Sequence, residues 1–525
     1  MKQGEEAYER ARDDYLYSGM TSRLTLGNDT NNIFLDLLQT GRANTAPRSP
    51  HESRLMCACN HFQAHIDAKQ REGRGTDYLK RLFRTITQKL HFTFYRIEEA
   101  HEVGMTFELM NSRGKELSAL ELLKNYLMYW VSRNVATEWE RRDITARINK
   151  AWKNVYTNLA AWDGDAHENQ CLRVAWTLYC AHTPKYWKGY EGFKSDEYLP
   201  LRNFSGARTK EATKGFLIRF VDGLAEVSGL YASVMLPSAD SRLPKQAAHW
   251  FTKLHRTKNL ANFLPLMVAA RRAFHVGEVT ESDYVAHLEA LECYAYRVFL
   301  YEEKRSNAGK SMFYRLGNEV FKGNQTLESA TVAVHALIRY YSPEKSFQAT
   351  LQLPDDWYYS RHCLKYTLYE YELHLLSTEG QGRAPKLAWS DLVDSTIEHI
   401  LPQQPKESSR WLKDWNPGQI EHCLHNIGNL VLTQNNSAYS NFEFVRKRGM
   451  VGESPSYANS DIRQERRVAR FNVWTYDEFA QRRVEIATWI GERWSSQEAK
   501  VVDASEVDED SDADEYAEAL VEGVS

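Results

Sequence analysis

The sequence lacks the features of membrane, secreted and disulfide-stabilised proteins. None of its apolar runs approaches the roughly 18 residues that a membrane span needs. Its charged, tyrosine-rich start contains no apolar segment of the kind found in signal peptides. The seven cysteines are scattered and form no C-x-x-C pair, which indicates free thiols rather than a disulfide framework. We therefore expect a cytoplasmic protein without a membrane partner.

Basic residues are missing from the last stretch of the chain. Residues 501–525 hold ten acidic residues and no lysine or arginine, which leaves 66 basic and 60 acidic residues elsewhere. Such a tail is typical of a disordered, solvated segment, and a weaker alternative is that it mimics nucleic acid and covers a basic surface. The formal net charge of −4 therefore does not argue against a DNA-binding body.

Length and composition indicate an ordinary globular protein of more than one domain. A chain of 525 residues is too long for a single hydrophobic core. Its 42% hydrophobic and 26% charged residues are typical of soluble domains. No internal repeat of fixed period is visible.

Helical patterns dominate the sequence. Ser118 with Glu121, and Thr475 with Glu478, are capping-box pairs that predict the start of a helix. Apolar residues follow each pair on one helical face: Leu123, Leu127 and Trp130 after the first, Phe479, Ile486, Trp489 and Ile490 after the second. Aromatic residues between these helices are expected to fill a helical core rather than to bind a ligand. The pattern predicts a mainly α fold.

The character of the sequence changes after a Gly-, Ser- and Pro-containing linker at residues 377–386. Residues 391–400 and 428–433 are short β-branched runs that predict two strands, and residues 442–449 predict a helix after them. A second domain boundary is expected near Asn134. The order strand, long loop, strand, helix distinguishes the C-terminal part from the helical body.

A Glu-His pair in the first predicted strand, and asparagines around the second, suggest hydrolytic chemistry. Hydrolysis of a phosphodiester needs a base that takes a proton from water and a cation that stabilises the leaving oxygen. A neutral histidine suits the first task, and a divalent metal held by carboxylate and amide oxygens suits the second. We therefore predict His399 as the base, Glu398 and Asn436 as metal ligands, and Asn429 as a brace of the loop that carries His399. The alternative is a surface Glu-His pair with asparagines that serve turns.

These blocks resemble a known nuclease domain. E-H-I-L-P-Q (398–403), G-N-L-V-L-T (428–433) and N-S-A-Y-S-N (436–441), followed by Phe444 and a Lys-Arg pair, resemble the C-terminal HNH-type domain of the GmrSD family of modification-dependent (type IV) restriction endonucleases. The resemblance implies a small ββα-metal fold, a divalent metal (Mg²⁺ or Mn²⁺) and double-stranded DNA as the substrate, including base-modified phage DNA.

The resemblance also implies roles for single residues. His399 matches the general base of the HNH motif, Asn429 its catalytic middle asparagine, and Asn436 its last position, near the metal. His425 is expected beside the site, where it would hold the loop or a phosphate, and Asn441 is expected to cap or pin the following helix.

A structural zinc site is an alternative interpretation of His422, Cys423 and His425. A complete site needs four ligands, and no second ligand pair is visible in the sequence.

A dense basic region follows the predicted site. Arg446, Lys447 and Arg448 are expected to contact DNA phosphates, and four further arginines continue the region: Arg463, Arg466, Arg467 and Arg470. The alternative is a solvated helical face.

Residues 107–124 resemble the end of the N-terminal, ParB-like nucleotide-dependent domain of the same family. Asn111, Arg113 and Lys124 would then lie near a nucleotide phosphate, and the alternative is a loop that only starts a helix. The family's D-G-Q-Q-R motif does not occur in this sequence. Either the start is truncated, or a separate chain supplies the missing segment, or nucleotide hydrolysis has been lost. We therefore expect no strong nucleotide dependence.

The predicted architecture is a multi-domain helical body with a small C-terminal nuclease domain. It has four parts: a remnant of the ParB-like domain at 1–134, a helical middle domain at 135–385, the HNH-type domain at 386–500 and the acidic tail at 501–525. The expected function is that of a metal-dependent DNA endonuclease of a phage-defence system. The alternatives are a catalytically silent DNA-binding or regulatory subunit that retains the fold, and a purely structural helical scaffold.

Overall fold

The protein is described from a computed structural model. The described residues are 14–19, 21–26, 30–47, 50–73, 75–91, 117–162, 165–180, 188–194, 198–201, 204, 209–353, 355–379, 384–450, 452 and 454–496. They are mainly helical, as predicted, and they form two compact units that meet in sequence between Ala239 and Asp240. The acidic tail and the predicted contacts Asn111 and Arg113 lie outside the described residues.

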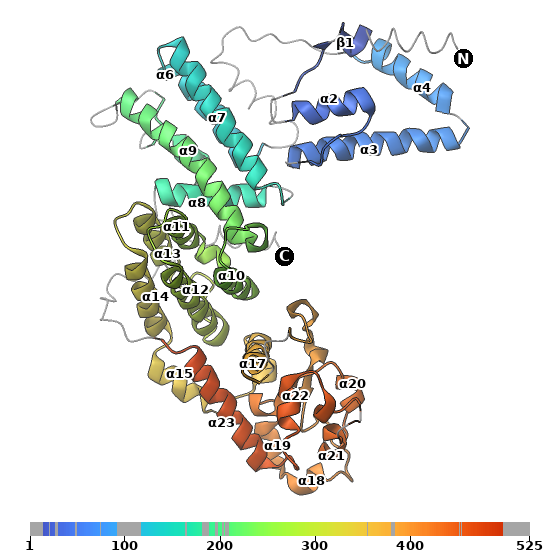
Figure 1. Ribbon diagram of the computed structural model, residues 1–525, viewed down its shortest axis with the longest axis vertical. Coiled ribbons are helices and arrows are strands. Elements are labelled where there is room, and N and C mark those ends of the chain that lie inside the picture. The colour runs from blue at the N-terminus through green and yellow to red at the C-terminus, as the bar shows by residue number, and fades with distance from the viewer. Residues whose placement is uncertain are drawn as a thin grey trace. The chain divides into compact units, whose positions relative to one another are not determined.

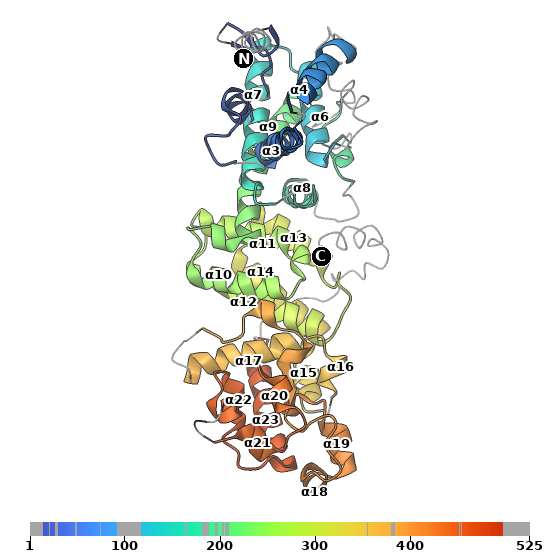
Figure 2. The same ribbon diagram turned by 90° about the vertical axis from the view of Figure 1, so that its right-hand side faces the viewer.

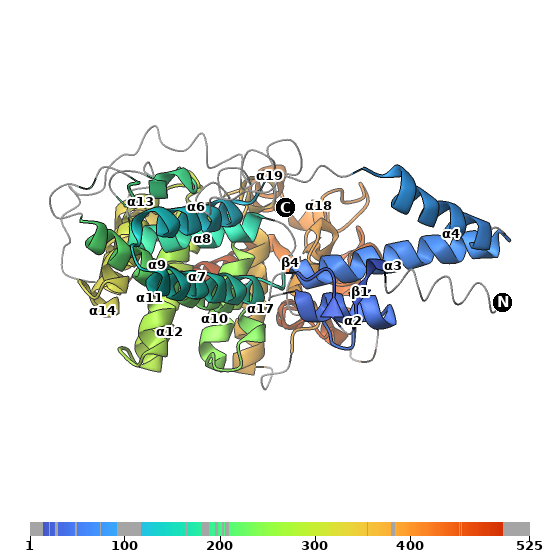
Figure 3. The ribbon, with the colours of Figure 1, turned by 90° about the horizontal axis from the view of Figure 1, so that it is seen from above.

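The first unit consists mainly of helices and contains one short β-hairpin. In chain order its elements are β1 (Tyr17–Ser18), β2 (Thr21–Ser22), α2 (Asn31–Thr40), α3 (Pro50–Arg71), α4 (Gly75–Arg84), the π-helical η1 (Thr85–Lys89), α6 (Ala119–Asn134), α7 (Glu138–Asn158), α8 (Ala166–Tyr179), η3 (Glu191–Lys194), α9 (Lys210–Met235) and η4 (Pro237–Ala239). Helices α2 and α4 pack against α3 (Figure 3). Helices α6 and α8 pack with α7 and α9, and the latter two lie side by side (Figure 1).

Large aromatic side chains form the core of these helices, as the sequence predicts. Trp130 and Trp152 are fully buried, and each indole N–H donates to a backbone carbonyl, that of Pro200 at 2.8 Å and that of Leu120 at 3.0 Å. A buried indole N–H needs an acceptor. These two bonds provide it and also fix the orientation of the rings.

The second unit begins with a layer of helices (Figure 2). Its elements are α10 (Lys245–Arg256), η5 (Leu260–Asn262), α11 (Leu264–His275), α12 (Glu281–Tyr294) continued by the π-helical η6 (Ala295–Tyr301), α13 (Lys310–Phe321), α14 (Leu327–Tyr341), α15 (Glu344–Leu351), α16 (Trp357–Ser360) and α17 (Leu364–Glu379). Helix α11 packs on α13, and α12 packs on α10 and α14.

The rest of this unit surrounds a two-stranded sheet. In chain order it contains η7 (Trp389–Asp391), η8 (Asp394–Thr396), β3 (Ile397–His399), α18 (Trp411–Asp414), α19 (Pro417–Cys423), η9 (Ile427–Asn429), β4 (Leu430–Leu432), α20 (Asn436–Tyr439), α21 (Phe444–Arg448), η10 (Tyr457–Asn459), α22 (Arg463–Val468) and α23 (Tyr476–Arg493). The predicted order of two strands followed by a helix is therefore present, with strands shorter than expected, but the predicted long loop between the strands contains α18 and α19.

Helix α23 joins the small sheet to the helical layer. At its middle, the buried Arg482 guanidinium donates to the carbonyls of Ile427, Gly428 and Leu430 at 2.8–3.0 Å. Just past its end, the indole N–H of the fully buried Trp494 donates to the buried Glu292 on α12 at 3.1 Å. The sheet is therefore anchored to helices that precede it in the chain.

Both predicted capping boxes are present at the starts of α6 and α23. All seven predicted apolar residues of these two helices are buried. The described part of the chain contains no helix that is long and apolar enough to cross a membrane.

Candidate active site

The candidate site lies at the end of strand β3. This strand pairs antiparallel with β4, with His399 opposite Leu430 and Glu398 opposite Val431. Neighbouring side chains of a strand point to opposite faces of the sheet. Glu398 and His399 consequently face different surroundings.

His399 lies against a second histidine. Its Nε2 is 3.1 Å from Nδ1 of His425, so one of these two nitrogens carries the shared hydrogen. The amide nitrogen of the exposed Gln403 lies 3.3 Å from Nε2 and 3.4 Å from Nδ1 of His399. His425 was predicted beside the site from its position in the sequence, and the structure places it in direct contact with the predicted base.

Aromatic rings from helix α16 form one wall of the site. Tyr358 packs edge-on against the His399 ring, with centroids 4.6 Å apart, and Tyr359 packs edge-on against His425 at 4.8 Å. The backbone N–H groups of Trp357 and Tyr358 donate to the carbonyl of His425 at 2.9 and 3.2 Å. Helix α16 therefore holds the loop that carries the second histidine.

The His399 ring is neutral at physiological pH. It is only 7% exposed, and burial lowers its pKa to about 3, with the charges of His425 and Lys447 acting in the same direction. A neutral imidazole has a free lone pair, which is the form that accepts a proton from water.

Glu398 occupies a closed polar pocket on the other face of the sheet. It is 3% exposed, and its Oε1 accepts hydrogen bonds from Lys447 Nζ at 2.6 Å and from the Tyr457 hydroxyl at 3.0 Å. Burial raises the pKa of Glu398, against the opposing effects of Lys447 and Tyr457. The carboxylate therefore depends on the ammonium for its charge.

Glu398, one of the two predicted metal ligands, does not fit a metal ion in this arrangement. Glu398 already binds an ammonium, which would repel a cation at the same oxygen. The amide nitrogen of Asn436 donates to the Ile397 carbonyl at 3.0 Å, so this side chain braces the start of β3. Among the residues that the structure describes, no three His, Cys, Asp or Glu side chains are grouped to hold a metal.

The zinc interpretation also lacks support in the described residues. Cys423 is buried in the hydrophobic core with Trp411 and Trp415. Among the described residues, no group of three His, Cys, Asp or Glu side chains that could hold a metal includes Cys423.

Asn429 holds the chain just after His399. It is fully buried, its Oδ1 accepts from the Leu401 N–H at 2.8 Å, and its Nδ2 donates to the carbonyls of Leu401 and Leu424 at 3.0 and 2.9 Å. Its Oδ1 also accepts from the Trp474 indole at 3.3 Å. This geometry matches the predicted brace, and the predicted catalytic role of Asn429 stays a prediction.

Asn441 does not occupy the cap position expected for it. The N-cap position of helix α21 is held by Glu443 and that of α20 by Asn435, each without a capping hydrogen bond from its side chain. Asn441 lies partly exposed in the turn between these helices. Asn441 is therefore not the N-cap residue of the following helix.

The basic run after the second strand divides between the interior and the surface. Arg446 is exposed and lies over the Phe442 ring, and Arg448 is partly exposed with its Nε bonded to the Ala469 carbonyl at 3.0 Å. Lys447 is buried, and its Nζ has three acceptors. The prediction that Lys447 contacts DNA is therefore wrong for this conformation, because no hydrogen of the ammonium is left for a phosphate.

Two further arginines of this region are engaged in ion pairs. Arg467 pairs with Glu379 and Glu485, and Arg470 pairs with Glu379. Their charge is therefore partly compensated by α17 and α23.

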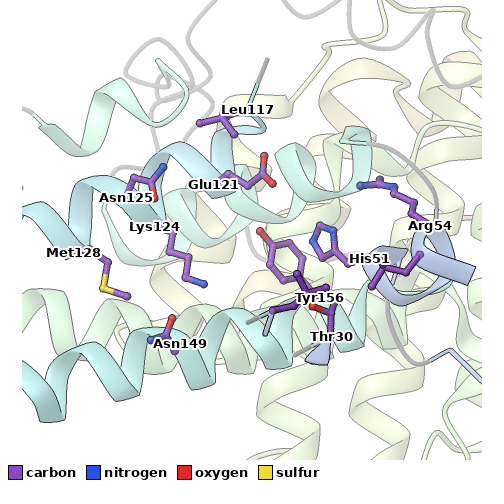
Figure 4. Close-up of a pocket in the computed structure, with 12 residues that line it drawn as sticks. Thr30, His51, Arg54, Leu117, Glu121, Lys124, Asn125, Met128, Asn149 and Tyr156 are labelled. Carbon is purple, nitrogen blue, oxygen red and sulfur yellow. The ribbon is translucent and has the colours of Figure 1, made fainter. Parts of the chain in front are cut away.

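Lys124, the described member of the predicted nucleotide contacts, lines a cavity of about 710 Å³ in the first unit. Figure 4 shows Lys124 on α6 together with Arg54 and His51 on α3 around this space. Glu121 also lines it, so the cavity carries charges of both signs.

Residues 341–489 match the family model described as GmrSD restriction endonucleases, C-terminal domain. The match indicates a nuclease role of the restriction type for this part of the chain and DNA as its substrate. It begins at residue 341, upstream of the predicted boundary at 386, and thus includes the helix that carries Tyr358. A comparison with curated proteins found no match for this chain.

The sequence interpretation missed Tyr358 and Tyr457. Tyr358 lies in D-D-W-Y-Y-S (355–360), ahead of the linker, where a Tyr-Tyr pair has no distinctive spacing relative to the histidines. Gln403, which also contacts His399, belongs to the E-H-I-L-P-Q block and was therefore predictable from the sequence.

Proposed function

We propose that the C-terminal part of this protein is an HNH-type DNA endonuclease that hydrolyses phosphodiester bonds with His399 as the general base. The observation that carries the proposal is the neutral, nearly buried imidazole of His399 at a strand end, in contact with His425, inside the region that matches restriction endonucleases. Double-stranded DNA, including base-modified phage DNA, is the proposed substrate.

The two histidines can act together. His399 takes the proton of the attacking water, and the resulting positive charge is shared with His425 across their 3.1 Å contact. A phosphate beside the pair raises the pKa of His399 during the reaction, because a nearby opposite charge favours the protonated form. Gln403 and Tyr358 would limit the rotation of the ring.

A divalent metal, when bound, would stabilise the charge of the leaving oxygen and the phosphate. The proposed Mg²⁺ or Mn²⁺ dependence rests on the resemblance alone, because Glu398 is paired with the Lys447 ammonium. Asn436 would offer its Oδ1, since its bond to the Ile397 carbonyl uses the amide nitrogen.

The test is a cleavage assay on plain and modified phage DNA with Mg²⁺, with Mn²⁺ and with a chelator. Cleavage that is lost in His399→Ala supports the proposal. The alternative, a catalytically silent DNA-binding or regulatory subunit, predicts DNA binding without cleavage under all these conditions. The proposed location of such an enzyme is the cytoplasm.

Nucleotide dependence is tested in the same assay. We propose that this chain alone cleaves without a strong requirement for a nucleoside triphosphate, with Arg113 and Lys124 able to contact a phosphate but unable to complete a hydrolytic site. Phosphate release is measured for each nucleotide with Mg²⁺ and DNA. DNA-stimulated hydrolysis that is lost in Arg113→Ala would contradict this, and activity that appears only with a second chain would indicate a segment supplied in trans.

A further inference from the structure

Lys447 is the most completely enclosed cation near the candidate site. Its side chain is fully buried, and its Nζ donates to Glu398 Oε1 at 2.6 Å, to the His399 carbonyl at 2.9 Å and to the Ile400 carbonyl at 3.1 Å. An ammonium has three hydrogens, and each has an acceptor here. The acceptors belong to three consecutive residues at the end of strand β3.

The position of these acceptors matters more than their number. The carbonyls of His399 and Ile400 belong to the two peptide units that follow the Cα atom of His399, so an ammonium bonded to both fixes the backbone from which the imidazole projects. On the other side, the Ile400 N–H donates to the Asn429 carbonyl at 3.0 Å. The strand end is thus held from both sides.

Glu398 supplies the negative charge that stabilises the buried Lys447 ammonium. A buried ammonium without a counter-charge would lose its proton or unfold the site. Because neighbouring residues of a strand face opposite sides of the sheet, Glu398 meets Lys447 on one face while His399 contacts His425 on the other. The Tyr457 hydroxyl adds a bond to the same carboxylate oxygen at 3.0 Å.

We propose that Lys447 is a positioning residue that holds His399 through the carbonyls of His399 and Ile400, with Glu398 as its counter-charge rather than as a metal ligand. This inference rests on the proposed function for its kinetic consequences. It replaces two roles suggested by the sequence, a phosphate contact for Lys447 and metal coordination for Glu398.

The test separates positioning from mere stabilisation of the fold. Lys447→Met removes the three bonds of the ammonium and leaves Glu398 as a buried charge without a counter-charge, bonded to the Tyr457 hydroxyl. The double variant Glu398→Gln with Lys447→Met removes both charges, which often restores stability when a buried ion pair is replaced as a unit. The matched control is Lys253→Met, which breaks another buried pair of this unit, Lys253 with Glu370 on helices α10 and α17.

Cleavage kinetics, DNA affinity and melting temperature are measured for each variant. We expect the double variant to regain most of the melting temperature lost in Lys447→Met, while its kcat stays about 10- to 100-fold below that of the unaltered protein, because a misplaced catalytic group costs up to about 100-fold. KM and DNA affinity should change less than about twofold, since no phosphate contact is removed. Lys253→Met should lower the melting temperature and leave kcat unchanged.

Recovery of kcat together with stability in the double variant would overturn the proposal, because Lys447 would then serve only the fold. Loss of DNA affinity in proportion to kcat would overturn it in favour of a phosphate contact. Glu398→Gln alone removes the counter-charge of the buried ammonium, so it should lower the melting temperature as Lys447→Met does. Lys447 still has two hydrogens for the two carbonyls even if it loses its proton, so kcat measured below the melting temperature should stay above that of the double variant. A loss as large as that of His399→Ala would mean that Glu398 acts in the reaction and would refute the assignment.

A spectroscopic readout distinguishes failure of this inference from failure of the proposed function. If the unaltered protein cleaves no DNA, the proposed function fails. The position of His399 is then followed by the NMR signals of its ring, which are identified by their loss in His399→Ala. These signals should shift in Lys447→Met and in the double variant, and stay in place in Lys253→Met. Ring signals that are unchanged in all three variants would overturn the inference.

Discussion

Replacement of Asn429 by alanine should release the backbone that follows His399. Asn429 satisfies four buried groups: the N–H and carbonyl of Leu401, the carbonyl of Leu424 and the indole N–H of Trp474. Alanine at this position leaves all four without this partner, inside a region where Asn429 itself has no exposed surface. The effect should therefore be local and large.

The magnitude follows from the number and burial of the lost bonds. Each buried polar group that loses its partner costs about 1–3 kcal/mol, and carbonyls that keep a second interaction lie at the low end of this range. We expect a loss of about 3–5 kcal/mol in the stability of this segment. At about 1.4 kcal/mol per factor of ten, a loss of 3 kcal/mol corresponds to an increase of about a hundred-fold or more in local opening.

Hydrogen exchange is the suitable assay, because a chain of two compact units does not unfold in a single step. Exchange of the Leu401 amide should accelerate about a hundred-fold or more in Asn429→Ala. Asn429→Asp should be at least as destabilising at pH 7, since it loses both donors and sets a carboxylate against two carbonyls. The control is Asn324→Ala, an exposed asparagine bonded to Glu319, which should leave exchange at Leu401 unchanged.

Two results would contradict this reasoning. Normal protection of Leu401 in Asn429→Ala would show that the four bonds contribute little. Normal protection combined with loss of cleavage would instead support the catalytic role that the HNH resemblance suggests for Asn429.

Three further predictions concern the site, the surface and the interior. His399→Ala should reduce cleavage by about 10²- to 10⁴-fold with DNA binding retained. The pKa of His399 is about 3 in the folded state, against an ordinary value of 6.5. As the pH falls from about 6.5 to about 3, the unfolded chain therefore binds a proton at His399 before the folded chain does. His399 destabilises the fold in this pH range. The variant should accordingly unfold less readily in acid, and near-normal cleavage would remove His399 from the mechanism. Arg446→Ala with Arg448→Ala should lower the log–log salt slope of DNA binding by about one unit per lost phosphate contact, alike for all DNA sequences, and an unchanged slope would mean a merely solvated face. Burial raises the pKa of Glu465 to about 7 from 4.5, so the folded state holds a proton that the unfolded state has lost, and stability falls as pH rises from about 4.5 to 7. Glu465→Gln should therefore raise the melting temperature at pH 8 and not at pH 4, and equal effects at both values would contradict this assignment.

Short-range patterns in the sequence determined much of the fold. The capping boxes at Ser118 and Thr475 and the apolar stripes behind them appear as predicted, because capping and amphipathic periodicity act over one to five helical turns. The two strands around His399 and Asn429 were also predictable, since β-branched runs bounded by Pro and Asn indicate strands over a few residues. The bracing role expected for Asn429 matches its bonds to Leu401.

Tertiary structure alone decided which charged groups are available for chemistry. Arg446, Lys447 and Arg448 look equivalent in sequence, yet helix α21 turns only the middle one into the interior, where it meets Glu398, 49 residues earlier in the chain. Tyr358 reaches His399 from a segment ahead of the linker. Burial and long-range pairing depend on how helices pack, and local sequence carries little information about either. For that reason the sequence placed Glu398 at a metal and Lys447 at DNA, while the folded chain pairs each with the other.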